Sequence, residues 1–139
     1  MALLTSYYVP GLHIEERAID VPLDWEGNTP GGAIKGETIR LFCRVVCAPE
    51  HVHDDLPLLV FLQGGPGGQC PRPLSPSSDG WIQEAIKHFR VVLPDQRGVG
   101  RSSRIDASTM KRMLDDGVSV ERQAWYLKLS LIHISEPTR

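Results

Sequence analysis

The chain has 139 residues, a formal net charge of −2 and a pI near 6.2, which suits one domain or a piece of one. This charge gives no sign of a basic surface that would bind nucleic acid, and no run of basic residues indicates binding to a membrane surface. The amino end lacks the charged flank and long apolar core of a signal peptide, and no apolar segment reaches membrane-spanning length. We therefore expect a cytoplasmic protein without nucleic-acid or membrane partners.

The three cysteines cannot all form disulfides. Cys43 and Cys47 would lie about 13 Å apart along one strand, which is too far for a disulfide. The spacing of Cys43, Cys47 and Cys70 is not that of a metal site, and buried cysteines usually act as small core residues. We expect reduced thiols, which fit a cytosolic setting.

The first half of the chain predicts two antiparallel strands. Apolar residues alternate with polar ones over residues 18–25, and Pro22 places that strand at an edge because proline cannot donate to a ladder. Residues 26–36 are rich in glycine and proline and predict a turn. Residues 38–47 show the clearest period of two and predict the second strand.

An unbroken apolar run and a second apolar run that contains Arg90 then predict strands that are buried on both faces, as in a parallel sheet. They are Leu58–Leu62 and Phe89–Leu93. Each runs directly into a glycine-containing loop, residues 63–68 and residues 94–102. Because ligand sites in such sheets lie at the carboxyl ends of the strands, both loops stand where a site is expected.

A helix is predicted between these two strands, and another near the end of the chain. Ser78 or Asp79 can cap the first, which has one apolar stripe, and a strand–helix–strand crossover makes the two strands parallel. The second is expected after Ser119. The apolar positions are Ile82, Ala85, Ile86 and Phe89 in the first helix, and Val120, Ala124 and Leu127 in the second.

The run Gly64-Gly65-Pro66-Gly67-Gly68 has more glycine than a tight turn needs. Glycine lets the main chain approach a ligand closely, so that backbone N–H groups can point at a developing negative charge. A phosphate cradle is the rival interpretation, but the run lacks the Gly-Lys-Ser/Thr ending of such loops and does not open directly into a helix. The pattern favours an oxyanion-binding loop.

Two further motifs have less specific interpretations. Residues 95–102 contain Gly98 and Gly100, but the third glycine of a dinucleotide fingerprint is missing. Their charged and amide side chains are expected to brace neighbouring loops.

Residues 51–55, His-Val-His-Asp-Asp, resemble the start of a dinuclear metal site, but Leu56 stands where the next histidine would be. A solvated turn is the favoured interpretation there, and no metal or other cofactor is expected.

Together, residues 58–67 and 95–102 resemble the proline iminopeptidase family of α/β-hydrolase serine peptidases, and the resemblance extends over roughly residues 14–128. It implies a Ser-Asp-His triad, a peptide substrate, and release of an N-terminal residue, classically proline, through an acyl-enzyme. It implies an oxyanion-hole loop of residues 64–67, in which Gly65 supplies the backbone donor, Gly64 and Pro66 shape the loop, and Gly67 completes it. The residues expected to support the site are Gln63, which replaces the histidine of many relatives, with Asp95, Gln96, Arg97 and Gly98.

The triad itself is not expected in this chain. Serine hydrolases of this fold carry the nucleophile in Gly-x-Ser-x-Gly, and residues 100–104 and 117–121 both lack the closing glycine. His88 and His133 are not assigned a catalytic role. The expected fold is therefore α/β, with residues 1–128 forming the N-terminal part of an α/β-hydrolase domain, a mixed and mostly parallel sheet with flanking helices that stops before the nucleophile elbow. Another α/β hydrolase, such as an epoxide hydrolase or esterase, and a non-catalytic fragment remain alternatives.

Residues 129–139 are expected to be foreign to the protein, because a transposase adapter used in DNA library preparation translates into these residues without a mismatch. The chain alone is expected to lack peptidase activity. We also expect it to be poorly stable, with an apolar edge and face left uncovered at residues 58–62 and 91–93.

Overall fold

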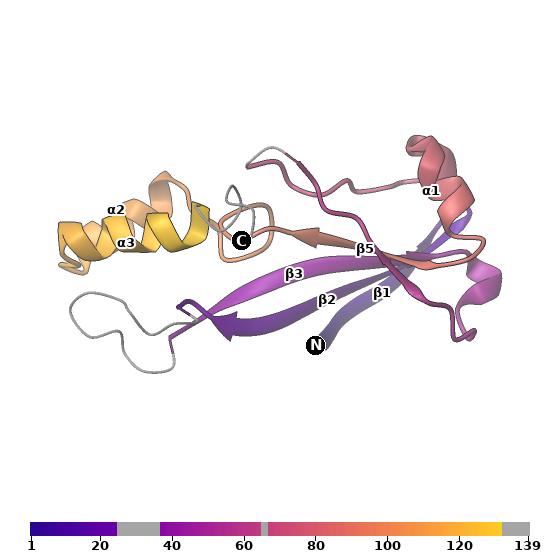
Figure 1. Cartoon of the computed structure of the whole chain (residues 1–139), viewed down its shortest axis with the longest axis horizontal. Helices are drawn as coiled ribbons and strands as arrows, with labels where there is room; N and C mark the ends of the chain where they lie inside the picture. The colour runs from indigo at the N-terminus through magenta and orange to yellow at the C-terminus, as the bar shows by residue number, and fades with distance from the viewer. Residues whose placement is uncertain (25–36, 65–66, 132–139) are drawn as a thin grey trace, which may run out of the picture.

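The computed structural model describes residues 1–24, 37–64 and 67–131, with side chains described as far as residue 128. One five-stranded sheet has the order β1-β2-β3-β5-β4. Helix α1 lies at one end of this sheet, and α2 and α3 lie together at the other end (Figure 1). The strands are β1 Ala2–Val9, β2 Leu12–Pro22, β3 Thr38–Cys47, β4 Leu58–Val60 and β5 Arg90–Asp95. The helices are η1 Pro49–His51, η2 Pro76–Ser78, α1 Gly80–Ala85, α2 Ala107–Asp115 and α3 Val120–Leu131.

Strands β1, β2 and β3 form an antiparallel meander. The predicted pair is confirmed, since β2 and β3 pair without interruption from His13↔Cys47 to Pro22↔Thr38. The strand predicted over 18–25 is the second half of β2, and β1 was not predicted. Pro22 belongs to a central strand, but β1 pairs with β2 only as far as Ala18. Proline therefore sits where β2 has a single neighbour, so the predicted edge position holds locally. Residues 25–36, where the predicted turn falls, lie outside the described residues.

The sheet is mixed, as predicted, but its parallel part is small. Strands β4 and β5 are parallel through Leu58↔Arg90 to Val60↔Val92, whereas the other three pairings among the described strands are antiparallel. The expected excess of parallel pairing is therefore not found in this part of the fold. Helix α1 provides the predicted crossover between β4 and β5.

The prediction of a doubly buried strand is right for β5 and wrong for residues 58–62. Val91 and Leu93 are fully buried, but Leu58 and Val60 are 65% and 52% exposed. The reason is position: β4 is the last strand of the sheet, so β5 is its one strand neighbour in the described chain. The expected apolar exposure is thus confirmed at the β4 edge. It is wrong for Val91–Leu93, which β3, β4 and α1 surround.

The main core lies between the sheet and α1. Ile82 and Ile86 pack on side chains from β2, β3 and β5, and Ala85 packs at the margin, as the predicted stripe requires. Phe89 lies beyond the end of the short helix. Each fully buried aliphatic side chain contributes about 1.5–3 kcal/mol. The sheet residues of this cluster are Leu12, Ile14, Val46, Val91 and Leu93.

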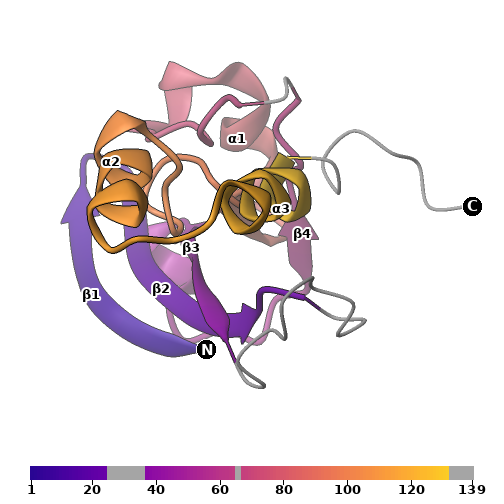
Figure 2. The same cartoon turned by 90° about the vertical axis from the view of Figure 1, so that its left-hand side faces the viewer.

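Helices α2 and α3 run side by side beyond the ends of the strands (Figures 1 and 2). Helix α2 was not predicted; Asp106 caps it by accepting a 2.9 Å hydrogen bond from Thr109 N. The Ser108 hydroxyl and the Thr109 amide hold the pKa of Asp106 at about 2. Among the residues that the structure describes, no helix is long and apolar enough to span a membrane.

The predicted helix after Ser119 is confirmed as α3, but its predicted apolar face is not. Val120 is 75% exposed and Ala124 is also exposed. Instead Trp125 and Tyr126 pack on Leu23 and Ile39 at the far end of the β2–β3 pair. The helix therefore uses its aromatic side chains, one position away from the predicted stripe, to dock on the sheet.

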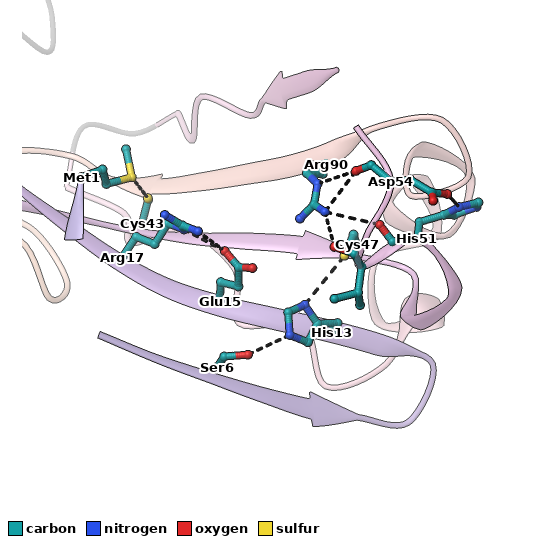
Figure 3. A network of polar contacts seen from close by, with 11 residues as sticks. Met1, Ser6, His13, Glu15, Arg17, Cys43, Cys47, His51, Asp54 and Arg90 are labelled. Carbon is teal, nitrogen blue, oxygen red and sulfur yellow. Dashed lines mark hydrogen bonds and ion pairs between the residues drawn. The ribbon is translucent and has the colours of Figure 1, made fainter. Parts of the chain in front are cut away.

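The second face of the sheet carries a polar network (Figure 3). Ser6 Oγ lies 2.7 Å from His13 Nε2, and Glu15 pairs with Arg17 at 2.6 Å. Burial lowers the pKa of His13 and raises the pKa values of Cys43 and Cys47. All three cysteines are buried free thiols, as expected.

A pocket of about 650 Å³ opens on this second face, and Val45, Val60 and Val92 contribute to its lining. At its rim, residues 51–55 form the predicted turn, in which His51 Nδ1 lies 2.6 Å from Asp54 Oδ2. The Arg90 side chain donates to carbonyl oxygens of this turn. The second face is therefore less covered than the face that α1 packs on.

Glu16 forms a buried ion-pair cluster on the core face. Its carboxylate contacts Arg101 and lies 3.5 Å from Arg44 Nε, and both guanidinium groups lie over the Phe42 ring. Burial alone would raise the pKa of Glu16, but the hydrogen bond and charge of Arg101, with the charge of Arg44, outweigh it. The pKa therefore lies below its ordinary value of 4.5.

This cluster predicts a loss of stability in acid. A depressed folded-state pKa stabilises the fold above the unfolded pKa, and that contribution disappears as the pH falls through the folded pKa. In the full-length protein, Glu16→Gln should therefore flatten the decline of unfolding free energy between about pH 5 and pH 3. Urea unfolding across this range measures the slope. Equal slopes for the wild type and the variant would contradict the prediction.

Candidate active site

The two predicted loops meet because they leave neighbouring parallel strands in register. Val60 is paired with Val92, and Phe61 N donates to Val92 O at 2.9 Å just beyond β4. Farther on, Gln96 Nε2 donates to Gln63 O at 2.9 Å. The carboxyl ends of β4 and β5 are thus joined by hydrogen bonds.

The first glycine of the glycine-rich loop has free space at its side-chain position. Gly64 is exposed, and a Cβ built there would meet no atom within 4 Å. Gly67 has a φ of 96°, a conformation that favours glycine. Gly65 and Pro66, the expected oxyanion donor and its neighbour, lie outside the described residues.

Asp95 links both loops through its carboxylate. It is 3% exposed; Oδ1 accepts from Cys70 N and Oδ2 accepts from Arg101 N, each at 2.9 Å. Hydrogen bonds between backbone N–H groups and an ionised carboxylate are stronger than neutral ones. The segment that follows the glycine loop is therefore held against residues 95–102.

The second loop is also anchored to β2 and β3. Arg97 donates to the carbonyl oxygens of Pro22 and Leu23 at 2.9 and 2.8 Å. Ser102, which is buried, donates to Asp95 O at 2.6 Å and accepts from Phe42 N at 2.9 Å. Sequence reasoning singled out Arg97 but missed Ser102, because a lone serine gives no periodic signal.

A pocket of about 520 Å³ lies between the loops, and three of the seven residues that line it are glycines. Gly67 contributes from the first loop, and Gly98, Val99 and Gly100 from the second. The remaining lining residues follow these loops in the chain and are Gln69, Arg104 and Ile105. Gly98 has a φ of 76° and packs against Ile105. A space bordered by glycine backbone at the carboxyl ends of two parallel strands suits a ligand approached by main-chain N–H groups.

The histidines without an assigned role lie away from these loops. His88 is exposed and precedes β5, whereas the loops follow the other end of that strand. His133 lies outside the described residues. Within residues 1–24, 37–64 and 67–131, no group of three His, Cys, Asp or Glu side chains could hold a metal ion.

Comparison with known proteins agrees with this arrangement. The sequence pattern of the alpha/beta hydrolase fold family matches residues 57–131, which include β4, α1, β5 and both loops. The chain belongs to the alpha/beta hydrolase family. The predicted α/β-hydrolase fold is thereby confirmed.

This alpha/beta hydrolase chain is also similar to proline iminopeptidases. It is 42% identical over 107 residues to the proline iminopeptidase of Aeromonas sobria, an alignment covering 77% of this chain and 24% of that protein. It is 36% identical over 96 residues to proline iminopeptidase aneH of Aspergillus aculeatus, covering 66% of this chain and 21% of that protein. The resemblance seen in the sequence is confirmed. The chain spans about a quarter or less of the length of these curated relatives.

Proposed function

We propose that the whole protein is a serine aminopeptidase that releases an N-terminal residue, preferentially proline, from peptides. The observation that carries this proposal is the pair of loops at the ends of β4 and β5, joined by the Gln96–Gln63 and Asp95–Cys70 hydrogen bonds. Such a braced glycine-rich loop suits an oxyanion hole, which requires donors fixed before the reaction. Similarity to proline iminopeptidases supports the choice of substrate.

In this mechanism a serine attacks the carbonyl carbon of the N-terminal residue while a histidine accepts the serine proton. Gly65 N–H and the N–H that follows the serine hold the oxyanion of the tetrahedral intermediate. The C–N bond then breaks, the histidine protonates the leaving amine, and water hydrolyses the acyl-enzyme. Because this chain contains no Gly-x-Ser-x-Gly, we place the triad in other parts of the whole protein.

The loop-bracing residues would act indirectly. Gln96 holds the start of the glycine loop and Asp95 holds the segment that follows it, while Arg97 attaches the second loop to the end of β2. Gly98 allows the chain to turn at positive φ beside Ile105. These residues support the site without contacting the substrate.

Substrate profiling of the full-length protein tests this function. We expect proline arylamide to give the highest kcat/KM, above alanine arylamide, an aryl ester and an aryl epoxide. A serine-directed phosphonate should abolish turnover, and EDTA should leave it unchanged. Preferred hydrolysis of the ester or the epoxide would favour the alternative hydrolases. The 139-residue chain by itself should show no turnover in the same assay.

A further inference from the structure

The orientation of the Gln96 side-chain amide follows from the hydrogen bond that it makes with Gln63. The Gln63 carbonyl oxygen can only accept, so the amide nitrogen of Gln96 faces it at 2.9 Å. The amide oxygen, Oε1, must therefore point away from Gln63. This oxygen is buried and has no hydrogen-bond donor among the described residues.

A buried acceptor without a donor is unfavourable, and buried polar atoms in folded proteins are nearly always paired. Gln96 directly follows β5, and its amide reaches across to the carboxyl end of the neighbouring β4. Oε1 is therefore buried at the strand ends where the proposed function places the reacting groups. A donor from the segment that carries the nucleophile would satisfy it.

The nitrogen side of the same amide controls the entry to the glycine loop. A trans peptide is planar, and its C=O and N–H groups point in opposite directions. Holding the Gln63 carbonyl toward Gln96 therefore turns the Gly64 N–H away from Gln96. A Cβ at Gly64 would meet no atom within 4 Å, so no packing at its side-chain position holds this peptide in place. Among the described residues, the hydrogen bond from Gln96 Nε2 to Gln63 O fixes the plane of this peptide.

We propose that Gln96 is a positioning residue that couples the oxyanion loop to the nucleophile segment. Its Nε2 fixes the Gln63–Gly64 peptide, and its Oε1 accepts a hydrogen bond from an N–H of the segment that bears the nucleophile. This inference rests on the proposed serine-hydrolase function and adds a residue whose two amide atoms act on two different elements.

Two substitutions separate the two halves of the amide in the full-length protein. Gln96→Glu retains an acceptor and loses the donor to Gln63 O, whereas Gln96→Lys retains a donor and loses the acceptor. Each should lower kcat by up to about 10²-fold, because small displacements of catalytic groups can cost that much. KM should change little. Affinity for a proline boronic acid, a tetrahedral mimic, should fall in parallel with kcat, while affinity for proline itself stays unchanged.

Gln123→Glu is the matched control. Gln123 is buried and, like Gln96, donates through Nε2 to a backbone carbonyl, that of Val118 at 2.8 Å, but it lies in α3. Its substitution should lower the melting temperature and leave kcat and boronate affinity at wild-type values. This comparison separates loop positioning from a general effect of placing a carboxylate against a carbonyl oxygen.

Each outcome bears on the proposal. Wild-type kcat in Gln96→Glu would show that the Gln63 contact does not position the loop, and wild-type kcat in Gln96→Lys would overturn the acceptor role of Oε1. Equal losses of boronate and proline affinity would indicate a merely structural residue. Kinetics are measured with whichever arylamide or ester the wild type hydrolyses, so a wrong substrate class affects only the proposed function. A wild-type protein that hydrolyses neither the arylamides nor the ester would overturn both the proposed function and the role of Gln96.

Discussion

Replacing Gly65 with proline in the full-length protein should lower kcat by about 10²–10³ while the fold persists. The substitution removes the backbone N–H that we propose as an oxyanion donor. Proline is needed for this test because the other residues all keep their backbone N–H. A preorganised donor of this kind stabilises the transition state by roughly 3–4 kcal/mol. Steady-state kinetics on proline arylamide measure the loss, and circular dichroism measures retention of the fold.

Gly80→Pro is the matched control for introducing proline in place of glycine. Gly80 is the first residue of α1, where proline is well accommodated, and a Cβ there would meet no atom within 4 Å. The preceding Asp79 is extended, with φ −133° and ψ 103°, as a residue before proline should be. This variant should keep wild-type turnover. Full activity in Gly65→Pro would remove Gly65 from the oxyanion hole.

Local sequence patterns were sufficient to predict the secondary-structure elements whose environment is set by neighbouring strands. The alternation over residues 38–47 predicts β3 correctly, because β2 pairs with it over its whole length and β5 pairs with it over residues 42–46. The two apolar runs predict the parallel pair, and the glycine clusters mark the loops at their ends. The contact between Gln96 and Gln63 spans 33 residues, so sequence reasoning predicted bracing without identifying the partners.

The incorrect or missing predictions concern elements whose burial is decided by their position in the fold and not by their local sequence pattern. β4 is an apolar run and yet is half exposed, because it lies at the sheet edge. Helix α2 carries apolar side chains at helical spacing, namely Ala107, Met110, Met113 and Leu114, although none of its nine residues is buried. Sequence reasoning missed both this stripe and the Asp106 cap. In α3 the docking residues Trp125 and Tyr126 are adjacent in sequence, a pattern that a search at helical spacing does not favour.

Gly100→Ala should give the largest loss of stability of any single methyl addition among the described glycines. Gly100 has a φ of 58°, and a Cβ at this position would lie 2.2 Å from Asp95 Oδ2. The left-handed conformation costs a non-glycine residue roughly 1–2 kcal/mol, and overpacking a filled site costs about 1–3 kcal/mol more. The clash also falls on the oxygen that accepts from Arg101 N, so relieving it would disturb the contact that holds the second loop.

Gly117→Ala separates these two costs. Gly117 follows α2 with a φ of 71°, but a Cβ there would meet no atom within 4 Å. The variant should therefore show the conformational cost alone, about 1–2 kcal/mol. Urea unfolding of both full-length variants gives the difference, which measures the steric contact with Asp95. Because Asp95 also accepts from Cys70 N after the glycine loop, Gly100→Ala should lower kcat at temperatures where it remains folded, whereas Gly117→Ala should not. Equal destabilisation of the two variants would show that the carboxylate of Asp95 can move aside, and that it does not hold the two loops together.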